Sequence, residues 1–181
     1  MRNFTCNFKY TIMIKSVENI LNVQIEKESY SSHLYLSMAS WAETQGYEGI
    51  AQWLYVQADE ERLHMLKFIH YVNERGGNAV ISAIKAPPAK FKDVMEIFQS
   101  VLRHEEFITA SINEIVSVCN KEKDFTTLNF VQWFVAEQIQ EEKSARAIID
   151  KVKLLGKQNL YLLDKDIMAM RAAGEPAGPA A

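Results

Sequence analysis

Four long stretches of the chain place apolar residues in alternating steps of three and four, the spacing of one face of an α-helix. These stretches cover residues 16–45, 48–75, 93–120 and 125–155, and a shorter fifth covers residues 159–171. Strand-like alternation is weak throughout the sequence. The pattern therefore predicts an all-α fold in which the four long helices pack as a bundle.

Residues with known preferences for helix ends support these limits. Ser16 and Asp124 stand where the first and fourth helices begin, and both side chains are suited to cap free backbone N–H groups. Glycines follow the first, second and fourth helices at Gly46, Gly76 and Gly156. The break between the first two helices is so short that they must be antiparallel.

A long connection joins the second and third helices. Residues 76–92 include Pro87-Pro88 and carry no helical stripe. Fully extended, this segment would reach roughly 55 Å, which is more than the ~40 Å length of the second helix. It therefore allows a crossover that makes the third helix parallel to the second. We expect a four-helix bundle with a long crossover between helices 2 and 3 and a short fifth helix.

Composition narrows the class of protein. The chain has 181 residues, 48% of them hydrophobic, which is enough for one domain with a substantial core. A net charge of -3 without a basic stripe argues against binding to nucleic acid. The sequence contains no apolar run of about 18 residues or more, so it predicts no membrane-spanning helix. Its two cysteines, Cys6 and Cys119, form neither a disulfide framework nor a Cys-x-x-Cys site, which is typical of a cytoplasmic protein.

Polar residues interrupt each of the four long stripes near the middle of its helix. Mid-length positions of bundled helices meet at one depth, whichever way the helices run. We therefore expect these side chains to converge in one layer of an otherwise apolar core. The interrupting residues are Glu28 in the first helix, Glu61 and His64 in the second, Glu105 in the third, and Gln138 and Glu141 in the fourth.

Four buried carboxylates need compensation, because burying an ionised group costs several kcal/mol. No Lys or Arg lies on the same stripes, and two divalent cations would balance the four charges. Oxygen-rich ligation with one imidazole and no thiolate suits paired iron or manganese better than structural zinc. The alternative is that these Glu residues lie at the bundle edges and pair with solvent.

Four sequence stretches resemble bacterial non-haem ferritin: QIEKESYSSHLY at 24–35, ADEERLH at 58–64, RHE at 103–105 and NFVQWFVAEQ at 129–138. The similarity covers nearly the whole chain, from about residue 13 to residue 171. It implies a ferritin-like di-iron domain at residues 16–171. We expect residues 1–15 to be a disordered N-terminal extension and residues 172–181 to be a disordered tail.

The resemblance also implies roles for the interrupting residues. Two iron ions per subunit would be bound, with Glu61 bridging them. The first site would comprise Glu28, Glu61 and His64. The second would comprise Glu61, Glu105 and Glu141, with Gln138 in the place of an amide that lines the site.

Further positions match the family in part. Tyr35 is similar to a tyrosine thought to donate an electron during oxidation; the alternative is that its hydroxyl caps the polar layer. Bacterioferritins, which resemble the chain in fold, have a haem-ligating Met where this chain has Arg62, so no haem is expected. Glu60 and Glu137 match an accessory third iron site, but Gln140 stands where the family has another Glu.

Residues off the inward stripes are expected at the surface. Three histidines are predicted to be surface or interface residues rather than ligands: His33, His70 and His104. Three apolar side chains point outward and would be exposed on a monomer: Leu34, Leu36 and Trp41. Such exposure predicts a homo-oligomer.

The resemblance implies iron storage with ferroxidase activity. Fe(II) and O2 would be the substrates, and Fe(III) mineral would be stored inside a shell of twenty-four subunits. One alternative is a rubrerythrin-like di-iron peroxidase, which the lack of a rubredoxin-type Cys-x-x-Cys pair disfavours. Another is a metal-free helical interaction bundle, which leaves the buried charges unexplained.

Overall fold

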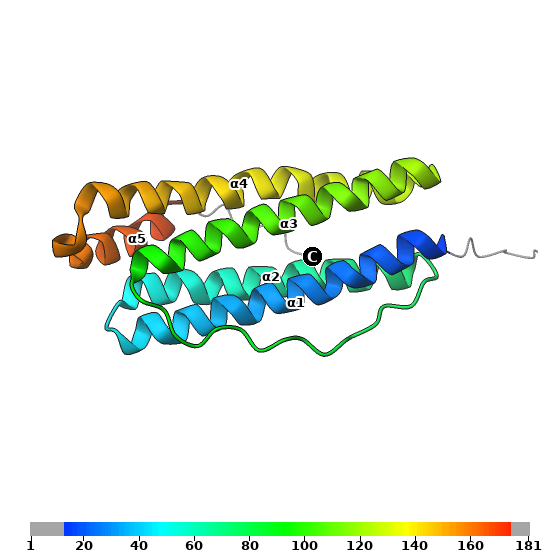
Figure 1. Cartoon of the computed structure of the whole chain (residues 1–181). Coiled ribbons are helices and arrows are strands. Elements are labelled where there is room, and N and C mark those ends of the chain that lie inside the picture. The colour runs from blue at the N-terminus through cyan, green and yellow to red at the C-terminus, as the bar shows by residue number, and fades with distance from the viewer. Residues whose placement is uncertain (1–12, 175–181) are drawn as a thin grey trace, which may run out of the picture.

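The chain folds into two antiparallel pairs of long helices, with a fifth helix across one end (Figure 1). The structure is a computed structural model that describes residues 13–174, and no strand occurs within that span. The predicted all-α bundle is therefore confirmed. Its elements are α1 (Lys15–Thr44), α2 (Glu48–Glu74), α3 (Val94–Glu122), α4 (Phe125–Leu155), a 3₁₀ turn (Lys157–Asn159) and α5 (Leu160–Gly174).

The connection between α2 and α3 is the predicted long crossover. It runs along the outside of α1 from one end of the bundle to the other, so α3 starts where α2 starts and runs parallel to it (Figure 1). Side chains of α1 hold it in place. Asn22 donates to the carbonyl of Asn78 at 3.1 Å and accepts from the backbone N–H of Val80 at 2.7 Å. Farther along, Ser37 Oγ donates to the carbonyl of Pro88 at 2.6 Å.

The helix limits lie within three residues of the predicted ones, and those of α4 coincide with them. Asp124 caps α4, since its Oδ1 accepts from the backbone N–H of Thr127 at 3.0 Å. The cap expected at Ser16 is wrong: α1 begins at Lys15, and its N-cap residue, Ile14, has no side chain that can accept a hydrogen bond. A Ser near the start of a helical pattern favours a cap but does not fix the first helical residue.

The expected extension and tail lie mainly outside the described residues. The described parts of these two segments are residues 13–15 and 172–174. Met13 is buried, next to the start of α1, and α5 continues to Gly174.

The interior consists of two apolar clusters that follow one another along the bundle. One includes Leu54 and Phe98, and the other includes Phe68 and Ile112. On each long helix, the polar interruption of the stripe falls between the residues of the two clusters. The layer contains Gln24, Glu28, Ser31, Gln57, Glu61, His64, Glu105, Gln138 and Glu141, all of them buried.

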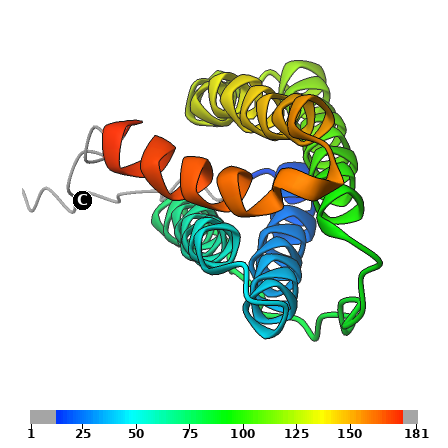
Figure 2. The same cartoon turned by 90° about the vertical axis from the view of Figure 1, so that its left-hand side faces the viewer.

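Helix α5 closes one end of the bundle. Figure 2 looks at this end and shows α5 crossing it between α2 and α4, which it contacts. Leu163 and Ile167, on the part of α5 whose side chains the structure describes, are buried. The start of α2 lies very close to α5, because Asp164 Oδ1 accepts from the backbone N–H of Ile50 at 2.8 Å. A Cβ atom on Gly49 would stand 2.1 Å from the carbonyl oxygen of Asp164, so this contact requires glycine.

The outward apolar residues differ from the prediction at one position. Leu34 is only 5% exposed and belongs to the first apolar cluster, so its assignment to the surface is wrong. The reason is that α1 packs against both α2 and α3, and thus buries a face wider than one stripe. Leu36 is 41% exposed, and Trp41 is half-buried. Nowhere between residues 13 and 174 is there a helix with the length and apolar character needed to cross a bilayer.

Candidate metal centre

Helices α1 and α2 bring three candidate ligands together at the middle of the bundle. One ligand atom each from Glu28, Glu61 and His64 can be chosen so that all lie within 4.8 Å of one another. Glu61 and His64 share a helix face because they are three residues apart. All three side chains are buried, with at most 5% exposure. The structure therefore brings together the residues predicted for the first metal position.

Two oxygens of this group have no hydrogen-bond partner within the described chain. They are Glu28 Oε2 and Glu61 Oε2, and both atoms are buried. His64 Nδ1 lies 3.6 Å from Glu61 Oε2, which is too long for a hydrogen bond. Buried acceptors are almost always satisfied, so an unsatisfied pair calls for an explanation. A cation between these atoms would supply it, and the donor set fits a divalent metal that accepts oxygen and imidazole nitrogen.

Side chains of α3 and α4 complete the layer. Tyr35 on α1 donates a short hydrogen bond to Glu105 Oε1. The amide of Gln138 donates to Glu105 Oε2 at 3.1 Å, and the amide of Gln57 donates to Glu141 Oε2 at 3.2 Å. The predicted residues of the second position, on α3 and α4, are thus all buried in this layer.

Burial controls the ionisation of the four carboxyl groups. It raises the pKa of Glu28 and of Glu61 well above the ordinary value of 4.5. The charges of neighbouring carboxylates raise both pKa values further, although the contact with Glu28 opposes this for Glu61. The pKa of Glu141 is raised well above that value for the same reasons. Burial also raises the pKa of Glu105, although hydrogen bonds from Tyr35 and Gln138 oppose this. Without a cation, the layer therefore favours protonated carboxyl groups.

Aromatic rings contact the polar layer at His64 and contribute Tyr35 to it. His64 packs edge-on against Trp133 and Phe134, with ring centroids 5.4 and 5.7 Å apart. Tyr35 is fully buried, and burial together with the nearby Glu105 carboxylate raises its pKa well above 10.0. These rings lower the polarity around His64 and Tyr35, and charge interactions are strong in a medium of low polarity.

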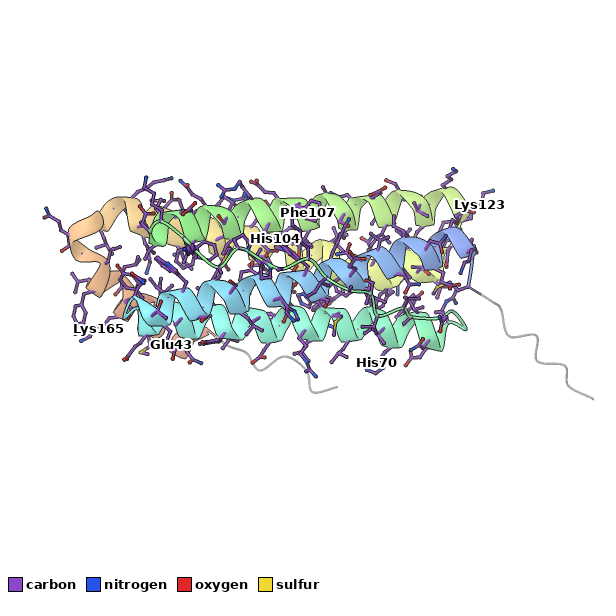
Figure 3. The ribbon with its side chains drawn as sticks, turned by 60° about the horizontal axis from the view of Figure 1, so that its bottom comes forward. Glu43, His70, His104, Phe107, Lys123 and Lys165 are labelled. Carbon is purple, nitrogen blue, oxygen red and sulfur yellow. The ribbon has the colours of Figure 1, made fainter. Side chains whose placement is uncertain are left out.

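One histidine was misassigned from the sequence. His104 was predicted to be a surface or interface residue, but it is half-buried and lies between α3 and α1, whereas His70 points away from α2 (Figure 3). His104 Nε2 lies 2.7 Å from Ser31 Oγ, and its ring packs edge-on against Tyr35. Desolvation by burial lowers the pKa of His104 to about 4, so its ring is neutral at physiological pH.

Two glutamines of the layer were not among the residues predicted for the site. Gln24 and Gln57 each lie one turn before a candidate ligand on their helix, and both donate to a carboxylate of the layer. Their place in the apolar stripe could have indicated this role, because a buried amide needs a hydrogen-bond partner. The contact of Ser111 with Gln24 could not be predicted from the sequence, because a Ser within a helix has no preferred role.

A second acidic group adjoins the first. Glu60, Glu137 and Glu141 also present ligand atoms that lie within 4.8 Å of one another. Glu60 and Glu137 are only half-buried. Gln140, the residue that breaks the match to an accessory site, is exposed, and Glu141 completes the group in its place.

Fold and site together define a class: an antiparallel four-helix bundle with a long crossover, whose apolar interior holds a layer of carboxylates and one imidazole suited to metal cations. Comparison with known families agrees with this class. The model of the ferritin-like domain matches residues 18–155, so the chain belongs to the ferritin-like family.

Several curated proteins are similar over most of their length. A probable bacterial non-heme ferritin-like protein of Haemophilus influenzae is 45% identical over 158 residues, covering 86% of this chain and 96% of the relative. The bacterial non-heme ferritin of Campylobacter jejuni is 41% identical, covering 86% and 95%. That of Escherichia coli O6:H1 is 38% identical, covering 83% and 92%.

Solved structures show the same fold. An open pore ferritin from the hyperthermophilic archaeon Archaeoglobus fulgidus superimposes with a TM-score of 0.85 at 41% identity, covering 87% of this chain and 98% of that chain. A closed form of this ferritin, engineered by site-directed mutagenesis, gives a TM-score of 0.84 at 40% identity, covering 86% and 96%.

Proposed function

We propose that this protein stores iron and oxidises Fe(II) with O2 at a di-iron centre inside each subunit. The observation that carries the proposal is the pair of unpartnered buried oxygens on Glu28 and Glu61, which face one imidazole in an apolar interior. Membership of the ferritin-like family and the names of the relatives support iron as the metal. Iron is here the substrate and the cargo.

Each buried side chain has a part in this function. Glu28, Glu61 and His64 would hold the first Fe(II), and Glu61 would bridge to the second. The second Fe(II) would be held by Glu105 and Glu141, with Gln138 lining the position. Because the raised pKa values keep these carboxyl groups protonated in the absence of metal, binding of iron would release protons.

Tyr35 is proposed to act beside the second position. Its hydroxyl donates to Glu105 Oε1, so the ring is in direct contact with a proposed ligand. Each Fe(II) gives up one electron, so the pair would reduce O2 by two electrons to the peroxide level; Tyr35 would supply one electron, with loss of its phenolic proton, to reduction beyond that level. Burial and the neighbouring carboxylates disfavour its phenolate form, so the proton stays on the ring oxygen at rest.

Storage requires a closed compartment, which one bundle does not provide. We propose a homo-oligomeric shell of twenty-four cytoplasmic subunits. Exposed apolar side chains on the bundle and on α5 support burial against further copies, because a monomer would leave them in water. Those on α5 and near its start include Leu154, Tyr161, Leu162 and Met168, each at least half exposed.

An aerobic Fe(II) titration with Glu61→Ala tests the central role of the bridging carboxylate. The variant should lose rapid iron oxidation and keep its assembly size, because the side chain contributes to both metal positions. Glu74→Ala is the matched control, since Glu74 is an exposed carboxylate on the same helix. Oxidation by Glu61→Ala at the wild-type rate would contradict the role.

Iron titration and size measurement also test the two alternative functions, a rubrerythrin-like di-iron peroxidase and a metal-free helical interaction bundle. A rubrerythrin-like peroxidase would consume hydrogen peroxide rapidly and would not retain iron mineral. A metal-free interaction bundle would show no saturable uptake of Fe(II). Size determination before and after iron loading, together with the oxidation time course, discriminates among the three functions.

A further inference from the structure

The two oxygens of the Glu28 carboxylate have different surroundings. Oε1 accepts a hydrogen bond from Gln24 Nε2 at 2.8 Å, from one turn earlier on α1. Oε2 is buried and has no partner in the part of the chain that the structure describes. Gln24 therefore occupies one oxygen of Glu28 and leaves the other free for a cation.

Gln24 is itself oriented from α3. Ser111 Oγ donates to Gln24 Oε1, and Lys27 Nζ donates to Ser111 Oγ at 2.6 Å. A lysine ammonium can only donate hydrogen bonds, so Ser111 accepts from Lys27 and keeps its own proton for Gln24. Gln24 must then turn its carbonyl to Ser111 and its amide N–H to Glu28. With Glu28 ionised, as it is beside a bound cation, the opposite orientation of the amide would place two acceptors against each other.

This chain of hydrogen bonds leads from the edge of the α1–α3 interface to the polar layer. Lys27 is half-buried, and its Nζ lies 5.0 Å from the ring centroid of Phe107, which is labelled on α3 in Figure 3. Ser111 is 6% exposed and Gln24 is fully buried. Because solvent does not reach Gln24, an apolar residue at this position would leave Glu28 Oε1 without its donor.

On the basis of the proposed function, we propose that Gln24, Ser111 and Lys27 are positioning residues that set the affinity of the cation position at Glu28. They hold the carboxylate so that its unpartnered oxygen faces the partners on α2. None of the three ligates the cation. Glu141, a proposed ligand of the second position, lies outside this network, because it accepts its hydrogen bond from Gln57 instead.

Zinc binding to the assembled, metal-stripped full-length protein tests the network. Gln24→Leu removes the donor to Glu28, and Ser111→Ala removes the group that orients Gln24. Both should weaken Zn²⁺ binding at the Glu28 position by roughly 10-fold, the usual effect of losing an outer partner of a metal ligand. Calorimetric titration gives the affinities, and anomalous diffraction from zinc-soaked crystals shows which position loses occupancy.

Two further variants distinguish positioning from general damage. Ser111→Thr keeps the hydroxyl and should retain wild-type affinity. Ser32→Ala is the matched control: Ser32 Oγ donates to the carbonyl of Ala58 at 2.7 Å, so the variant also loses one buried hydrogen bond between helices, but not one connected to Glu28. It should bind Zn²⁺ like the wild type.

Wild-type affinity and occupancy in both Gln24→Leu and Ser111→Ala would overturn the network, even if the wild type binds two ions as proposed. An equal loss of affinity in Ser32→Ala would also overturn it, because the effect would then be general. Absence of zinc from both positions of the wild type would instead contradict the di-iron centre of the proposed function, and the network with it.

Discussion

At the scale of single residues, the centre depends on carboxyl groups that are buried before any cation neutralises them. The pKa of Glu61 is raised by burial and by the charges of its neighbours. A group whose pKa is higher in the folded than in the unfolded protein stabilises the fold below its unfolded pKa. This contribution is lost as pH rises through the folded value.

Glu61→Gln should therefore stabilise the metal-free protein in a pH-dependent way. The amide resembles the protonated carboxyl group, so the variant and the wild type should unfold at similar temperatures near the ordinary pKa of 4.5. Toward neutral pH the wild type should become the less stable of the two. Thermal unfolding followed by circular dichroism across this range measures the difference. A constant difference would mean that Glu61 does not titrate on unfolding.

Excess Zn²⁺ should make the wild type more stable than Glu61→Gln at neutral pH, the reverse of the order without metal. The cation binds the folded wild type and compensates the ionised carboxylate, whereas Glu61→Gln lacks a bridging ligand. Removal of zinc with a chelator should restore the metal-free order. The midpoint of thermal unfolding at fixed free zinc concentration reports both steps.

Tyr35→Phe separates the two roles considered for this tyrosine. Loss of the hydroxyl leaves Glu105 Oε1 without its donor, which should lower the free energy of unfolding by about 1–3 kcal/mol. If Tyr35 also supplies an electron, single-turnover oxidation of Fe(II) should slow while Zn²⁺ binding is retained. An unchanged oxidation rate in a less stable protein would leave only the capping role.

At the scale of elements, α5 is docked by a capping interaction that comes from far along the chain. Asp164 accepts from the backbone N–H of Ile50, at the start of α2, where Tyr47 in the N-cap position offers no side-chain bond. Asp164→Ala should cost about 1 kcal/mol of stability. Asp164→Asn, which retains a side-chain oxygen, should cost less. Chemical denaturation measures both, and equal losses would argue against the capping role.

Gly49→Ala should have a larger effect at the same contact. The added methyl group would lie 2.1 Å from the backbone carbonyl of Asp164, which no side-chain rotation can relieve. We expect α5 to move away from α2, and hydrogen exchange in α5 to accelerate. Gly46→Ala is unsuitable as a control because Gly46 has a φ of 80°. Gln52→Ala, at an exposed position of the same helix, is suitable.

At the scale of the whole molecule, the proposed shell predicts a mass. Twenty-four copies of the 20.7 kDa chain give about 500 kDa. Light scattering on metal-free protein should report this value and should not change when Glu61 is replaced, since the layer is internal. A monomer or dimer at all concentrations would contradict the shell and would leave the exposed apolar residues unexplained.

The sequence by itself determined the helices and the carboxylates and imidazole of the polar layer. Whether Glu28, Glu61 or Glu105 faces inward depends on the phase of a helical stripe, which is a local property of neighbouring residues. Their common depth follows from the rise per residue, and the length of residues 76–92 is enough to predict the crossover. The fold and the predicted members of the layer could therefore be inferred before any coordinates.

Only the tertiary structure decided which side chains meet across helices. Ser111 contacts Gln24 from 87 positions away in sequence, and Asp164 caps α2 from 114 positions away. Such contacts depend on the rotation and axial offset of one helix against another, which no local pattern contains. Leu34 and His104 were misassigned for the same reason: a helix with two neighbours buries residues beside its main stripe as well as those within it.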